Sequence, residues 1–160
     1  MRKTRALVGL AIAAGIATPV VTSGSPVSAT TSICSTETPA KVGAALGLKV
    51  TKGYKGNQGD VTECTYWAGG KEAVIIAIEP HGMASNYQAT FKSLKSLGEH
   101  PKVVKTFAPY RAFDTWIGSP ALGYTFAVVV LEGITVISVV ANGSTLVRVD
   151  GLVKTILSLE

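Results

Sequence analysis

Two cysteines constrain the fold of this chain more than any other feature of the sequence. Cys34 and Cys64 are its only cysteines, and neither a C-x-x-C spacing nor a nearby histidine accompanies them. A zinc site would need more ligands, and a thiol redox centre would need closer spacing. In a protein exported from the reducing cytoplasm, such a pair most economically forms one structural disulfide. We therefore predict a Cys34–Cys64 disulfide, which leaves neither thiol free to act as a nucleophile.

The first part of the chain has the pattern of a secretory signal peptide. Three basic residues precede an apolar run at 7–17, and small residues lead up to Ala29. The apolar run is shorter than the ~20 residues that cross a bilayer, which disfavours a transmembrane anchor. We predict a signal peptide at 1–29 and a single secreted domain at 30–160, located outside the cell or in its envelope.

Lipid attachment at Cys34 is the alternative to free secretion. Lipoprotein processing requires a small residue immediately before the modified cysteine, whereas Ile33 stands there. The apolar run also ends well upstream of this position. We therefore expect a free chain without a membrane span.

Removal of the leader would change the charge of the protein. The full chain has a formal net charge of +5, and the leader contains three of its fifteen lysine and arginine residues and no acidic residue. The remaining domain has a net charge of +2 and no cluster rich in lysine or arginine. Nucleic acid is therefore not an expected partner.

Three helices are predicted from end signals and apolar spacing. The segment 38–47 has a threonine cap, a proline at the first helical position and a glycine stop. Ser85 and Gln88 match a capping box for a second helix, which ends at Gly98. Apolar residues at helical spacing predict a third helix within 145–160.

Alternation and β-branched residues predict the strands, and glycine-rich turns join them as hairpins. The glycine-rich stretch 53–60 is predicted as a flexible loop, and the longest hairpin is expected at the centre of the sheet. We predict an α+β fold, with an antiparallel sheet packed against about three helices on one face and held by one disulfide. The main predicted strands are 61–67, 72–78, 102–106, 112–117, 122–130 and 134–140.

Several of these features resemble a group of exported actinobacterial proteins, mostly small lipoproteins of the cell envelope. The resemblance rests on Cys34, the helix at 38–47, the C-T-Y stretch at 64–66 and the apolar strand at 74–78. In architecture the chain also resembles the extracellular sensor domain of the PknH-type serine/threonine kinases. The resemblance implies an α+β domain whose disulfide fastens the first helix to the sheet, and it implies no catalytic residues. Many members of the group are lipidated, whereas this chain lacks the processing signal.

Catalytic motifs are absent from the sequence. His81 and His100, the only histidines, each lie near a glutamate in a predicted loop. A Glu–His pair can serve acid–base catalysis, and a hydrolase that uses Glu79, His81 or His100 is the less favoured alternative. No G-x-S-x-G or H-E-x-x-H motif and no carboxylate cluster is present. We predict a protein that is not an enzyme and uses neither a metal nor a cofactor.

Aromatic residues with polar tips form the candidate binding surface. Tyr54, Tyr110, Arg111 and Trp116 are predicted in loops or at strand ends, and such side chains dominate recognition of proteins and peptides. One of the two aromatic residues at 66–67 is expected in the core beside the disulfide. We expect a monomer that binds a protein, a peptide or a cell-wall ligand. An inhibitor of an extracellular enzyme is the alternative, and it would need a rigid loop near Tyr54 or Tyr110.

Overall fold

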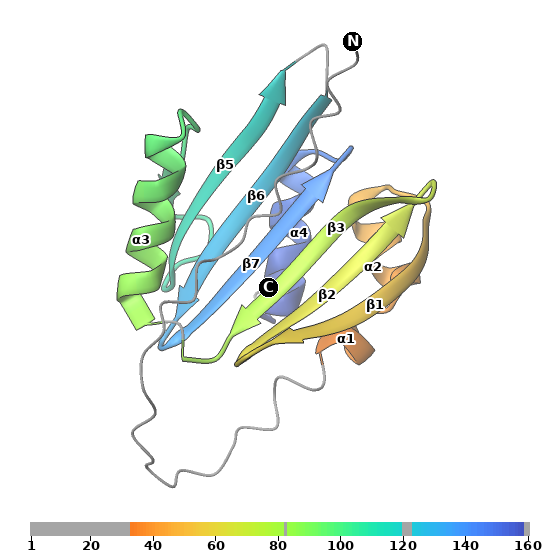
Figure 1. Ribbon diagram of the computed structural model, residues 1–160, viewed down its shortest axis with the longest axis horizontal. Coiled ribbons are helices and arrows are strands. Elements are labelled where there is room, and N and C mark those ends of the chain that lie inside the picture. Colours follow the sequence, from red (N-terminus) through yellow and green to blue (C-terminus); the bar gives the residue numbers. More distant parts are fainter. Residues whose placement is uncertain (1–32, 82, 120–122, 159–160) are drawn as a thin grey trace, which may run out of the picture.

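The computed structural model describes residues 33–81, 83–119 and 123–158 of the chain (Figure 1). The predicted signal peptide and its cleavage site lie outside these ranges. The described residues form four helices and seven strands. The helices are α1 (Ile33–Thr36), α2 (Pro39–Leu46), α3 (Met83–Ser96) and α4 (Leu146–Ile156). The strands are β1 (Val50–Gln58), β2 (Val61–Ala68), β3 (Lys71–Glu79), β4 (Lys102–Val104), β5 (Arg111–Ser119), β6 (Gly123–Glu132) and β7 (Thr135–Asn142).

The strands form one sheet in the order β1-β2-β3-β7-β6-β5-β4. Every neighbouring pair is antiparallel. Strand β7 is the central strand and its hairpin partner β6 lies next to it, which confirms the predicted central hairpin. The predicted α+β fold is therefore confirmed, with the short α1 added to the three expected helices.

Helices cover both faces of the sheet, so the prediction of a single helical face was wrong. Helices α2 and α4 pack on the face that includes Val128, whereas α3 packs on the face that includes Val129. Successive residues of a strand point to opposite faces, and both faces of β6 are apolar. The second apolar face needs a cover, and α3 provides it with Tyr87 and Leu94. Figure 1 shows α3 beside β5, away from α2 and α4.

The ends of α2 follow the signals read from the sequence. The Thr38 hydroxyl accepts a hydrogen bond from the Lys41 N–H at 3.4 Å. Gly47 ends the helix in the left-handed conformation, with φ of 66°. A residue without a Cβ adopts this conformation at little cost.

The start of α3 differs from the prediction. The helix begins at Met83, so Ser85 lies inside the first turn and does not cap it. Asn86 instead donates a hydrogen bond to a carboxylate oxygen of Glu79 at 2.8 Å. This tertiary contact ties the first turn of α3 to the end of β3, a link that a local capping pattern does not reveal.

Residues 53–60 were predicted as a flexible loop, and this prediction was wrong. Residues 53–58 belong to β1, and only Gly59 and Asp60 form the turn to β2. Glycine and lysine have low strand propensity, but pairing along β2 overrides it. The chain therefore has a long strand at one edge of the sheet where the sequence favours a loop.

Candidate functional site

A disulfide and a hydrogen bond hold the segment 33–39 against the sheet beneath β1 and β2. The predicted disulfide is present and joins Cys34 of α1 to Cys64 of β2, with Cα atoms 5.5 Å apart. The Tyr66 hydroxyl, also on β2, donates a hydrogen bond of 2.6 Å to the backbone carbonyl of Glu37. These links place α1 and Pro39 beside the outer strand β1.

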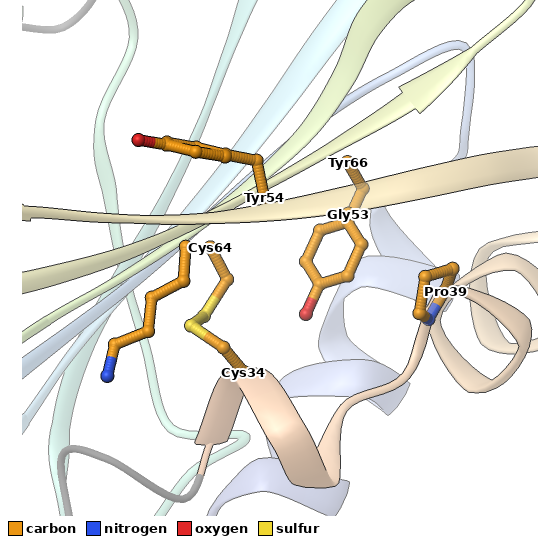
Figure 2. A pocket seen from close by; sticks show the side chains of 7 residues that line it. Cys34, Pro39, Gly53, Tyr54, Cys64 and Tyr66 are labelled. Atoms are coloured by element: carbon orange, nitrogen blue, oxygen red, sulfur yellow. A yellow bond between two sulfur atoms is a disulfide. The ribbon is translucent and has the colours of Figure 1, made fainter.

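A pocket of about 210 Å³ lies where these elements meet the edge of the sheet. Figure 2 shows the disulfide, Pro39 and Tyr66 on one side of β1 and the Tyr54 side chain on the other. Among the described lining residues, Lys55 alone has a formal charge. The lining residues are Cys34, Pro39, Gly53, Tyr54, Lys55, Cys64 and Tyr66.

The Tyr66 ring and Pro39 form one side of the pocket and pack directly over position 53, which has no side chain. A Cβ atom on Gly53 would lie 3.1 Å from the Tyr66 ring and 3.4 Å from Pro39. A glycine inside a strand often marks such a close approach. Burial, with a further contribution from the charge of Glu37, raises the pKa of Tyr66 to about 12. The Tyr66 hydroxyl therefore stays protonated at neutral pH, and this wall of the pocket is uncharged.

Strand β1 is an edge strand, and β2 is its only neighbour in the described sheet. In an antiparallel ladder, alternate residues direct their N–H and C=O groups to each side, so about half of those on β1 face outward. Among the described residues, no backbone hydrogen bond joins this outer side to another strand. Tyr54 is 66% exposed and Lys55 is also exposed. An unpaired backbone edge and the pocket thus lie side by side.

The other three candidate residues lie far from Tyr54. Tyr110 directly precedes β5, Arg111 begins this strand and Trp116 lies within it. Strand β5 is five strand positions from β1. Strands are about 4.8 Å apart, so roughly 24 Å separates β5 from β1. The four candidate residues therefore do not form one surface. Tyr54 also lies in a strand, not in the rigid loop that the inhibitor hypothesis requires at that position.

Two of these three residues have partners near the N-terminal end of β5. The Arg111 guanidinium lies over the Tyr87 ring, 5.3 Å from its centre, and lines a groove of about 150 Å³ beside α3. The Tyr110 hydroxyl is hydrogen-bonded to the carboxylate of Glu132, which raises the pKa of Tyr110. Both side chains thus have structural contacts within the fold.

Trp116 belongs to a second group of aromatic rings. Its ring centre lies 5.3 Å from that of His100 and 5.4 Å from that of Tyr124. Tyr124 in turn contacts Phe126 at 6.1 Å. Trp116 is 40% exposed, so this group is the second exposed aromatic surface that the described residues contain, and it serves below as the comparison for β1.

The two histidines of the hydrolase alternative do not share a site. His81 follows β3, whereas His100 contacts Trp116 on β5. Strand spacing and the rise along the strands place them about 20 Å apart. Both are exposed, and neither lines either of the two pockets described above.

A pair of carboxyl groups between β5 and α4 was missed by the sequence analysis. Burial raises the pKa of both Asp114 and Asp150, and the charge of Asp114 raises that of Asp150 further. Lys102 lowers the pKa of Asp114, and Lys154 lowers that of Asp150. Oxygen Oδ1 of Asp150 is buried and has no hydrogen-bond partner. The available signal was the position of Asp150 along the apolar stripe of the last predicted helix.

Replacing Asp150 by asparagine is expected to stabilise the protein at neutral pH, by less than about 1 kcal/mol because solvent screens a carboxyl group that is only partly buried. A carboxyl group whose pKa is raised by folding stabilises the fold in acid, and this contribution is lost as the pH rises through the folded-state pKa. The uncharged amide avoids that loss. Urea unfolding across a pH series measures the effect, with the exposed Asp60→Asn change as the control. A variant that is less stable than the parent at neutral pH would contradict this account.

No helix in the described ranges is long and apolar enough to cross a membrane. In the same ranges, no group of three histidine, cysteine, aspartate or glutamate residues is placed to hold a metal ion. Comparison of the chain with protein-family models, curated proteins and solved structures finds no match. The resemblance to exported actinobacterial proteins stays a prediction.

Proposed function

We propose that this protein is a non-enzymatic recognition domain that acts outside the cytoplasm and binds an extended polypeptide segment by strand addition to β1. The observation that carries this proposal is the nine-residue edge strand with a pocket directly beside it. In strand addition, backbone hydrogen bonds supply affinity, and pockets for alternate side chains supply specificity. The disulfide supports a site of action in an oxidising compartment.

The two faces of β1 differ in a way that suits alternating side chains. A segment paired with β1 would direct alternate side chains to the pocket face and to the face of Tyr54. Lysine on an edge strand protects against unselective pairing. Protection alone does not require a pocket lined by Tyr66 and Pro39. A guarded edge with an adjacent pocket is the arrangement expected of a selective site.

The proposal is tested with a displayed library of short extended peptides, selected on the protein with its disulfide intact. A selected peptide should shift the NMR signals of β1 amides and slow their hydrogen exchange. Tyr54→Ala should weaken its binding about five- to thirtyfold, the effect of losing an aromatic contact worth about 1–2 kcal/mol.

Trp116→Ala is the matched control, because it removes an exposed aromatic side chain roughly 24 Å away. It should leave peptide binding unchanged. If Trp116→Ala abolishes binding while Tyr54→Ala does not, the site lies on β5 and the proposal for β1 is wrong. The proposal would also be overturned if the protein selects no peptide from the library but binds wall glycans in a separate assay.

A further inference from the structure

We infer that the segment bound by β1 contains an acidic residue, then an aromatic or β-branched residue, then a compact apolar residue. This order reads from N- to C-terminus in a segment antiparallel to β1, the pairing used throughout the sheet. In that register the three residues lie opposite Lys55, Tyr54 and Gly53. The inference rests on the proposed function and adds the chemistry of the partner.

Lys55 accounts for the acidic residue. Its neighbour on β2 is Cys64, which carries no charge because it is disulfide-bonded. Lys55 is exposed and has no ion pair with the described residues. On its outer side, a ligand residue directly opposite would place its Cβ within about 4.5–5.5 Å of that of Lys55. A carboxylate there forms a favourable cross-strand pair, and a second ammonium group forms a repulsive one.

Gly53 accounts for the apolar residue. Because Gly53 has no side chain, the Tyr66 ring and Pro39 lie directly over its backbone, where the side chain of the opposite ligand residue can contact them. These groups stand 3.1 and 3.4 Å from the position of a Cβ on Gly53. This wall of the pocket is uncharged, because the Tyr66 hydroxyl is protonated and donates its hydrogen bond to the backbone carbonyl of Glu37. A polar ligand side chain would lose water there without gaining a partner.

Tyr54 accounts for the residue between them. It lies on the other face of β1 and is 66% exposed, with Thr65 as its neighbour on β2. Pairs of aromatic and β-branched side chains are favourable cross-strand contacts. A tyrosine or valine in the ligand would cover the exposed ring of Tyr54.

The test is a charge exchange between peptide and protein, followed by NMR titration. The probe peptide is Thr-Thr-Glu-Tyr-Val-Thr-Thr, and its partner has Lys in place of Glu. The parent protein should bind the Glu peptide about three- to tenfold more tightly than the Lys peptide. The variant Lys55→Glu should reverse this preference. Lys102→Glu, the same charge change on the opposite edge strand β4, should leave the preference as it is in the parent.

A second variant tests the pocket. Gly53→Val places a side chain against the Tyr66 ring and Pro39 and displaces them from the ligand contact, so it should weaken binding of the Glu peptide while the preference for Glu over Lys remains. A circular dichroism melt confirms that the variant is folded. Because Lys55→Glu alters only an exposed side chain, the charge test does not depend on the Gly53 variant.

The outcomes separate this inference from the proposed function. Equal binding of both peptides, with protection of β1 amides, would overturn the inference and leave strand addition standing. If neither these peptides nor any library peptide protects β1, both fail. A dimer of the chain that protects β1 and excludes the peptide would replace the acidic partner by a second copy and would also overturn the inference.

Discussion

Replacing Phe113 by alanine is expected to lower the free energy of unfolding by about 3–5 kcal/mol, the usual cost of deleting a fully buried phenylalanine. Phe113 is 0% exposed and lies on the β5 face that α3 covers. Its ring meets those of Tyr87 at 5.1 Å and Phe91 at 5.2 Å, both in edge-to-face geometry. The substitution removes both ring contacts and leaves a cavity under α3. Because small domains have a total stability of about 5–15 kcal/mol, the loss is a large fraction of the whole.

Chemical denaturation followed by circular dichroism measures this effect. Leu97→Ala is the matched control near the same helix, because Leu97 is 69% exposed. It should change stability by less than about 0.5 kcal/mol. A Phe113 variant within that same small range would mean that α3 contributes little to the packing of this face.

Removing the disulfide, by changing both Cys34 and Cys64 to serine, should cost roughly 3–4 kcal/mol. The bond joins residues 30 positions apart, and closing a loop of this length restricts the unfolded chain by about that amount. Helix α1 has four residues, none of them fully buried, and the bond ties it covalently to β2. The pocket would also lose part of its wall.

Unfolding of the double variant and of the reduced parent protein should give the same midpoint in denaturant. The comparison avoids single variants, in which one free thiol would remain. If both midpoints equal that of the oxidised parent, the bond contributes nothing to stability. In that case the attachment of α1 must come from the Tyr66–Glu37 hydrogen bond and packing alone.

The sequence predicted those parts of the fold that local chemistry determines. The cap at Thr38, the stop at Gly47 and the disulfide each follow from a residue type at a fixed place, and the structure confirms all three. The central hairpin followed from its length and its β-branched residues. These features depend on the preferences of individual residue types, which can be recognised in the sequence without knowledge of the tertiary contacts.

The remaining features depend on contacts between distant segments. Residues 53–58 of β1 were predicted as part of a loop because glycines and polar residues favour one, and the pairing with β2 that outweighs them has no local signal. The pocket arises where Gly53 meets Tyr66 and Pro39, which come from three different elements. Asp114 and Asp150 became neighbours only once α4 was packed on β6 and β7, next to β5. The candidate residues could be named from the sequence. The sequence could not show that Tyr54 lies on β1 while the other three lie on or beside β5, five strand positions away.

The position of β7 has a consequence for how the chain folds. This strand is the last of the seven in the sequence, yet it pairs with β3 in the middle of the sheet. Contacts such as that of Ile75 with Val140 close a long loop, and such distant pairings form slowly. Contacts between segments that are close in the sequence form early, so β1, β2 and the disulfide can form while β3 still has an open, apolar edge. The unfinished N-terminal half is therefore the species most exposed to aggregation, and the arrival of β7 ends that exposure.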